Sequence, residues 1–317
     1  SSIKFKTTFK NCILESMKRR QWKEAEFDDW DLNWAEKEWI LDVMAHVSSN
    51  QRVNHYRNFS ELCRKDLLIK NIKKYKKTLA ALYNFTPLTY NLPSEYSIFC
   101  EEFKKVNSQL WIMKPIGKAQ GKGIFLFRNI KEIGNADPYV VQKYIADPLL
   151  IGGKKFDMRI YALCVSYQPL TVYLYRTGFA RFTHHRYDLE DISNAYVHLT
   201  NVAIQKTSEN YDEKLGGKWL LQTLKLYLIS KYGKVSEAFY QIQQIIIKAL
   251  QAVQKVMIND KRCFELYGFD ILFDAQLKPW LLEVNASPSM TANTQVDSEL
   301  KISVLDDTFT IIDIERI

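Results

Sequence analysis

Asp270, Glu283 and Asn285 form the group of residues with the clearest chemistry in this 317-residue sequence. The segment 268–285 has the pattern of two strands joined by a turn at residues 275–278. In such a hairpin Asp270 lies opposite Glu283, and Asn285 faces the same side because side chains alternate along a strand. Opposed carboxylates repel each other unless a cation lies between them, and oxygen ligands of this kind suit Mg²⁺. We therefore expect these three residues to bind magnesium, with Glu283 able to bridge two ions.

The second face of the same hairpin is apolar and is expected to lie in the core. Its residues alternate with the polar ones: Ile271, Phe273, Leu282 and Val284. Trp280 and the apolar residues around it favour a hairpin at the centre of the fold. The alternative is a hairpin whose polar face meets solvent and binds no metal.

A glycine-rich loop, residues 117–123, follows the strand-like segment 111–115 and precedes another, 124–127. Loops of this kind cover phosphates with backbone N–H groups and cationic side chains. The spacing is not that of a Walker A loop, and a strand follows where a dinucleotide-binding turn needs a helix. Lys114 ends an otherwise apolar strand and needs an anion, either an ATP phosphate or a structural carboxylate. A plain glycine hairpin is the alternative for the loop.

The run 154–159 alternates so that Lys155, Asp157 and Arg159 share one face of a strand. The chain then becomes apolar through residues 160–165, which indicates that this charged face lines a cavity. The alternative is an edge strand carrying a surface ion pair.

The chain carries a formal net charge of +8, and nearly all of the excess lies in one segment. Between Arg52 and Lys77 nine basic residues are opposed only by Glu61 and Asp66, which leaves +7. A concentrated basic face implies an anionic partner, which could be nucleic acid, acidic lipid or an acidic polypeptide. No base-stacking motif supports nucleic acid. The alternative is a solvated lysine-rich helix.

The length indicates two or three packed subdomains, and we place them at residues 1–60, 61–146 and 147–317. Helical periodicity predicts helices over 61–82, 95–106 and 218–258, the last interrupted near Gly233. Strand-like runs are predicted at 110–114, 124–127, 139–144, 156–165 and 170–175, so the fold class is mixed α/β (α+β). No apolar run approaches the roughly 18 residues of a membrane span, and residues 1–6 have no apolar signal core. Five scattered cysteines without a CxxC pair favour a reducing compartment.

Taken together, these motifs resemble those of the tubulin–tyrosine ligase-like family. The resemblance covers almost the whole chain and includes the glycine loop, the 154–159 strand and the Asp270–Asn285 hairpin. It also includes the segments 54–58, 178–182, 198–201 and 281–289. Only residues 128–137 are shorter than is usual in the family, through either a truncated surface loop or a missing mobile segment. The resemblance implies an ATP-grasp fold with N-terminal, central and C-terminal subdomains.

The resemblance also implies roles for individual residues. Those implied to contact ATP are Lys114, Gln120, Gly121, Gln142, Lys143, Tyr144, Ile145, Lys155, Asp157, Thr200 and Asn201. Gln120 would also border the target glutamate, and Arg181 and Lys218 would hold an incoming free glutamate by its carboxylates. Asp270, Glu283 and Asn285 would bind two Mg²⁺ ions. Lys114, Arg181, Lys218 and Glu283 are the residues we expect catalysis to depend on most.

The implied activity is polyglutamylation of the acidic C-terminal tails of α/β-tubulin. ATP would convert an acceptor carboxylate into an acyl phosphate, which the amine of free glutamate would attack. This chemistry depends on positioning and charge neutralisation and needs no nucleophilic Ser or Cys. The alternatives are a weakly active microtubule-binding or scaffold subunit with accessory partners, and a glycine ligase of the same fold. The implied location is the cytoplasm and cytoskeleton, including the cilium or flagellum, with no membrane partner.

Overall fold

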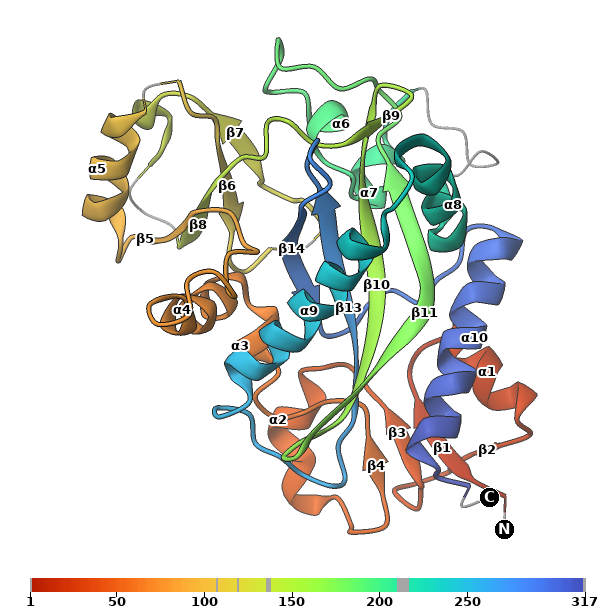
Figure 1. The fold of residues 1–317 in the computed structure, drawn as a ribbon. Helices are drawn as coiled ribbons and strands as arrows, with labels where there is room; N and C mark the ends of the chain where they lie inside the picture. Colours follow the sequence, from red (N-terminus) through yellow and green to blue (C-terminus); the bar gives the residue numbers. More distant parts are fainter. Residues whose placement is uncertain (1, 107, 119, 135–137, 210–216, 316–317) are drawn as a thin grey trace.

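The computed structural model describes residues 2–106, 108–118, 120–134, 138–209 and 217–315, and within them the strands form three sheets. The N-terminal sheet is parallel and has the order β2-β1-β3-β4. It lies at the bottom of Figure 1, beside both chain ends. Its strands and the helices of the same part of the chain are β1 (Lys4–Thr7), α1 (Cys12–Arg19), β2 (Lys23–Glu24), β3 (Leu32–Trp34), α2 (Trp39–Val43), η1 (Met44–His46) and β4 (Arg52–Val53).

A second sheet, antiparallel with the order β5-β8-β6-β7, stands at the upper left of the same view (Figure 1). Helix α5 packs against it through Phe99, which is fully buried against Trp111 and Tyr90. The elements of this part are α3 (Ser60–Cys63), α4 (Lys65–Lys76), β5 (Thr89–Leu92), α5 (Tyr96–Lys105), β6 (Trp111–Pro115), β7 (Phe125–Phe127), η2 (Ile130–Glu132) and β8 (Tyr139–Lys143).

The largest sheet is antiparallel, with the order β12-β11-β10-β13-β14 and β9 paired to β10. Its strands run through the middle of the molecule in Figure 1. The elements are β9 (Leu150–Ile151), β10 (Lys154–Tyr167), β11 (Leu170–Phe182), α6 (Ala195–His198), α7 (Val202–Gln205), β12 (Lys218–Leu220), α8 (Leu221–Tyr232), α9 (Ser236–Val253), β13 (Glu265–Phe273), β14 (Pro279–Asn285) and α10 (Gln295–Ile312).

Both faces of the largest sheet are buried along β10 and β13, and the alternation along β10 shows how. Ile160 and Ala162 belong to the core formed with α8 and α9. Tyr161 and Leu163 belong to the core shared by α1, α10 and the N-terminal sheet. Side chains two residues apart lie on one face, so Lys155, Asp157 and Arg159 continue the Tyr161 face beyond the part that α10 covers. The site therefore lies at the end of a sheet face that is core elsewhere.

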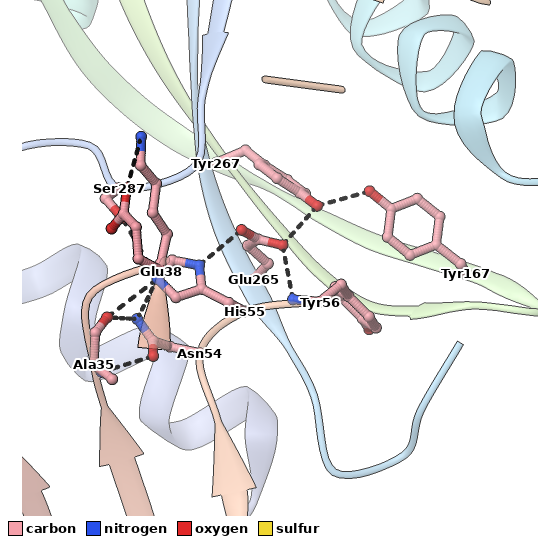
Figure 2. A network of polar contacts seen from close by, with 10 residues as sticks. Ala35, Glu38, Asn54, His55, Tyr56, Tyr167, Glu265, Tyr267 and Ser287 are labelled. Atoms are coloured by element: carbon pink, nitrogen blue, oxygen red, sulfur yellow. Dashed lines mark hydrogen bonds and ion pairs between the residues drawn. The ribbon is translucent and has the colours of Figure 1, made fainter. Parts of the chain in front are cut away.

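A buried polar network ties the N-terminal part of the chain to the largest sheet (Figure 2). The Glu265 carboxylate accepts from His55 Nδ1 at 2.8 Å, from the Tyr56 N–H at 3.1 Å and from the Tyr267 hydroxyl at 2.9 Å. Tyr267 in turn contacts the hydroxyl of Tyr167 at 2.8 Å. Because a buried carboxylate with its hydrogen bonds satisfied is costly to disturb, the network fixes where β13 starts relative to the segment after β4.

The mixed α/β class is confirmed, and most of the predicted elements are present. The predicted helix 61–82 is two helices, α3 and α4, and 218–258 is α8 and α9 with Gly233 in left-handed conformation (φ 75°) between them. The prediction was wrong at Lys218, which lies in strand β12 because it pairs with the edge of β11 before the helix begins. The division at residues 60 and 146 stays a prediction. In the described part of the chain no helix has the length and apolarity to cross a membrane.

Candidate active site

The hairpin of β13 and β14 has the predicted register. Asp270 pairs with Glu283 and Gly268 with Asn285, so the two carboxylates are directly opposed. Beyond Asp270 the register shifts, because a bulge places Ile271 opposite Leu281. The prediction that Leu282 belongs to the core was therefore wrong: it lines a cavity together with Leu272. Ile271, Phe273 and Val284 are buried in the core as predicted.

Asp270 is fully buried and is held by two arginines. Arg159 donates from Nε at 2.5 Å and from one terminal nitrogen at 3.0 Å, and Arg181 lies 2.8 Å away. Arg181 also makes a two-point contact to Asp157, at 2.8 and 2.5 Å. Burial alone would raise the pKa of Asp270, but the charges of Arg159 and Arg181 outweigh it and hold this pKa well below its usual range. Asp270 is therefore ionised and already neutralised by protein cations.

Glu283 has much weaker cationic support than Asp270. Its nearest cation is Lys65, 3.9 Å away, and the side-chain amide of Asn285 donates to it at 3.3 Å. Burial and the neighbouring charge of Asp270 raise the pKa of Glu283. A partly exposed carboxylate beside another carboxylate attracts a cation, so the donor set of Asp270, Glu283 and Asn285 fits the oxygen chemistry of Mg²⁺.

Lys114 and Lys155 point into the same cavity and have neutral partners. Lys114 donates to the side-chain oxygen of Gln142 at 2.7 Å, and Gln142 donates in turn to Thr89. Lys155 donates to the backbone oxygen of His198 at 2.7 Å and to the Tyr144 hydroxyl at 3.1 Å. Burial lowers the pKa of Lys114 to about 8 and that of Lys155 to about 7. Ammonium groups in this state gain most from a bound anion, which fits a polyphosphate.

Two adjoining cavities contain nearly all of the predicted site residues. The first, of about 90 Å³, is lined by every residue predicted to contact ATP, and by Asp270 and Glu283 as well. The second, of about 570 Å³, is lined by Lys218 and Asn285. Gln120, Arg181, Asn201 and Glu283 line both. The residues predicted to contact ATP thus line the first cavity, and Lys218 and Asn285 line the second. The residues common to both form a shared wall between them.

The glycine loop borders the first cavity through Gln120 and Gly121, and Gly121 lies close to Asn201. Gly121 has a φ of 79°, and a Cβ there would lie 2.5 Å from Ile204 and 3.1 Å from the side-chain oxygen of Asn201. Only glycine tolerates both the left-handed backbone and this approach. Gln120 also has a positive φ, of 60°. Ala119 and residues 135–137 of the short segment 128–137 lie outside the described residues.

Lys218 and Arg181 are direct neighbours across β12 and β11. Lys218 lies 3.0 Å from the carboxylate of Asp297, which also pairs with Lys301 at 3.0 Å. Both ammonium groups lie near the face of Phe179, at 4.6 and 5.8 Å from its centre. Burial lowers the pKa of Lys218 to about 8. At this end of the site, Lys218 and Lys301 therefore already share the Asp297 carboxylate as their partner.

Reasoning from the sequence missed several cations that line the cavities, among them Lys65, Lys301 and the guanidinium of Arg159 as a partner of Asp270. Lys65 was counted only as part of the basic segment, although its place at the first turn of α4 aims it at Glu283. Lys301 lies one helical turn after Asp297 on α10, a spacing typical of an intrahelical ion pair. That spacing was the available signal.

Comparison with known proteins decides the family. A family model described as the tubulin-tyrosine ligase family matches residues 43–316. The chain belongs to this family. It is 44% identical over 370 residues to a probable tubulin polyglutamylase TTLL9 of Bos taurus, covering 99% of this chain and 80% of the relative. The corresponding protein of Caenorhabditis elegans is 46% identical, covering 99% and 81%.

A probable alpha-tubulin polyglutamylase Ttll1 of Tetrahymena thermophila is 44% identical, covering 98% of this chain and 86% of the relative. The resemblance to the tubulin-tyrosine ligase family is confirmed, and with it the ATP-grasp class of fold. Among the described residues no three His, Cys, Asp or Glu side chains gather closely enough to hold a metal ion. The third member of the predicted donor set, beside Asp270 and Glu283, is the side-chain amide of Asn285, which is not one of these residue types. Magnesium binding therefore stays a prediction, as do the roles of the individual site residues.

Proposed function

We propose that this chain is an ATP-dependent tubulin polyglutamylase, which joins free glutamate to glutamate side chains in the acidic C-terminal tails of tubulin. The observation that carries the proposal is the shared wall between the two cavities, where Arg181 and Glu283 face both. Relatives that cover most of this chain are named as probable tubulin polyglutamylases.

ATP would bind in the first cavity, with its phosphates near Lys114 and Lys155. Two buried ammonium groups with only neutral partners support this assignment. Gly121 would allow the loop to close, and Thr200 and Asn201 would meet the nucleotide from the opposite wall. Two Mg²⁺ ions would be held by Asp270, Glu283 and Asn285, with at least one arginine contact of Asp270 exchanged. ATP would supply the phosphoryl group that activates the acceptor carboxylate.

Free glutamate would bind in the second cavity, where Lys218 and Arg181 would meet its carboxylates and Gln120 would border the acceptor. Two neighbouring cations suit a dicarboxylic amino acid, because glycine has only one carboxylate and could meet only one of them. This is the observation against the alternative of a glycine ligase. Both reactants would then lie next to Glu283, whose carboxylate would help to hold the Mg²⁺ that neutralises their charge.

The acidic tail would approach along helix α4. Lys70, Lys74 and Lys77 are exposed and spaced four and three residues apart, so they form one stripe on the helix. The same helix begins with Lys65, which lines both cavities. A basic stripe on the helix that also carries Lys65 would steer an acidic peptide, with strong dependence on salt.

The proposed setting is the cytoskeleton, with cilia or flagella as the finer location. Accessory subunits are part of the alternative in which the chain acts as a weakly active scaffold. The buried arginines and the charged groups at both cavities favour catalysis, because such groups are costly to keep without a function.

The experiment that tests the proposal is mass spectrometry of tubulin tails after incubation with ATP, Mg²⁺ and labelled glutamate, with and without excess glycine. Addition of labelled glutamate that depends on ATP is expected, and glycine is expected not to compete. Glycine addition would support the glycine ligase instead. Binding to microtubules without addition, also in the presence of a cell extract that supplies partners, would support the scaffold.

A further inference from the structure

Lys155 is held in place by His198 in two ways. The Lys155 ammonium donates to the backbone oxygen of His198 at 2.7 Å and to the hydroxyl of Tyr144 at 3.1 Å. That hydroxyl lies 3.0 Å from Nδ1 of the His198 ring. All three side chains are at least nine-tenths buried. The backbone contact explains part of the arrangement, but the imidazole itself has no role in the proposed chemistry.

The hydrogen bonds fix the state of the imidazole. Nε2 lies 3.1 Å from the backbone oxygen of Asp191, and a carbonyl oxygen only accepts, so Nε2 carries the proton. Burial lowers the pKa of His198, and Lys155 lowers it further. The Asp191 backbone contact and the charges of Asp188 and Asp191 oppose this shift without reversing it. Nδ1 of the neutral ring is therefore an acceptor.

An accepting Nδ1 sets the direction of the next hydrogen bond. The Tyr144 hydroxyl has one proton and donates it to Nδ1, which leaves its lone pairs for Lys155. Tyr187 packs its ring against His198 and also interacts with the Tyr144 hydroxyl. Its own hydroxyl donates its proton to the Ala146 backbone oxygen, so Tyr187 has no proton left to give to Tyr144. The chain of donors thus runs from Lys155 to Tyr144 to His198 to Asp191 without a conflict.

We propose that His198 is a positioning residue for Lys155. Its Nδ1 orients the Tyr144 hydroxyl, and that hydroxyl and the His198 backbone oxygen together aim the ammonium into the first cavity. The proposal rests on ATP binding in that cavity. His198 itself touches neither reactant in this scheme, and its effect passes through Tyr144.

Two substitutions separate the two ring nitrogens. His198→Asn places an oxygen near the position of Nδ1 and keeps an acceptor for Tyr144, whereas His198→Gln places its amide near Nε2 and loses that acceptor. Measured by calorimetry with ATP and no acceptor, His198→Gln should weaken nucleotide binding about tenfold, and Tyr144→Phe should do the same. His198→Asn should stay within about twofold of the unchanged protein.

A double variant and a control complete the test. Tyr144→Phe combined with His198→Gln should weaken ATP binding no more than either alone, because both remove one hydrogen bond. Tyr196→Phe removes a hydroxyl from the same short helix, bonded to Thr207 instead, and should leave binding unchanged. The KM for glutamate should not move in any variant.

Equal loss in His198→Asn and His198→Gln, or additive losses in the double variant, would overturn the proposal. If His198→Gln does not fold, unchanged ATP binding by Tyr144→Phe overturns it alone. Failure of the unchanged protein to bind ATP would be a different result, because it would remove the proposed function as well.

Discussion

The cations of the two cavities differ in whether they have an anionic partner. In the first, Lys114 and Lys155 contact only neutral oxygens. In the second, Lys218 is paired with Asp297, and at the shared wall Arg181 is paired with Asp157 and Asp270. Unpaired ammonium groups gain strongly from any anion, whereas paired ones bind a new anion only if the geometry competes with the existing partner. Under the proposed function, the first cavity would supply affinity and the second would select between amino acids.

The largest effect is expected where the two cavities meet. Glu283→Gln keeps the shape of the side chain but removes the charge that faces both cavities. Glutamate addition should fall about a thousandfold, since the Mg²⁺ that this carboxylate would hold supplies the charge neutralisation on which catalysis depends. Mass spectrometry of tubulin tails measures it, with circular dichroism to show that the fold is kept. Unchanged addition would remove Glu283 from the proposed site.

The contact of Arg159 with Asp270 can be tested by a substitution at Gly268. A Cβ at this position would lie 2.9 Å from both Arg159 Cδ and Pro288 Cβ, so Gly268→Ala displaces the guanidinium that holds Asp270. We expect a ten- to hundredfold loss of activity from the displaced guanidinium, and separately a loss of roughly 1–3 kcal/mol of folding stability from overpacking. Gly134→Ala, where nothing lies within 4 Å of the new Cβ, is the matched control. Equal kcat in both variants would contradict the role given to Arg159.

The low pKa values of Lys114 and Lys155 predict a pH dependence of ATP binding. Burial lowers the pKa of Lys155 to about 7 and that of Lys114 to about 8. A bound phosphate would raise both pKa values again, because an opposite charge favours the ammonium form. Binding therefore takes up protons: affinity is full below about pH 7 and falls as pH rises through 7 to 8, by up to tenfold per unit for each lysine that titrates. Calorimetry from pH 6.5 to 9 in buffers of differing ionisation enthalpy measures it.

Lys155→Arg should flatten the lower part of this profile, because a guanidinium keeps its proton throughout the range. A profile that is flat in the unchanged protein would show that neither lysine meets the nucleotide.

The smallest effect is expected outside both cavities, on helix α4. Lys74 is exposed, whereas Lys73 pairs with Glu95 at 2.7 Å. Lys74→Gln should raise the KM for tubulin about twofold at low salt, and Lys73→Gln should change it less. The difference should vanish at high salt. A larger effect from Lys73 would show that the exposed stripe does not guide the tail.

The sequence predicted the residues of the site better than their contacts. The alternation of Lys155, Asp157 and Arg159 and the pairing of Asp270 with Glu283 follow from the two-residue period of strands. The bulge that turns Leu282 into the cavity has no such signature, because it depends on how β13 packs against its neighbours. Likewise, the arginine partners of Asp270 come from two other strands, and no local pattern links them.

Lys218 shows the same limit for secondary structure. Its segment has the apolar spacing of the helix that follows, but three residues are taken up by pairing with β11. This pairing is a tertiary effect that overrides local propensity. Lys301 was missed for a related reason, since its partner Asp297 was not recognised as part of the site.

Strand β10 contributes to both cavities, and this has a consequence for how the enzyme can change. Lys155 and Arg159 lie four residues apart on one strand, about 13 Å along it, and their separation is fixed by backbone geometry. The distance between the proposed phosphate site and the proposed amino-acid site therefore cannot change in evolution without shifting the whole strand. Lys218, on the short edge strand β12, is free of that constraint. New amino-acid preferences should arise at this edge, while the spacing set by β10 stays the same.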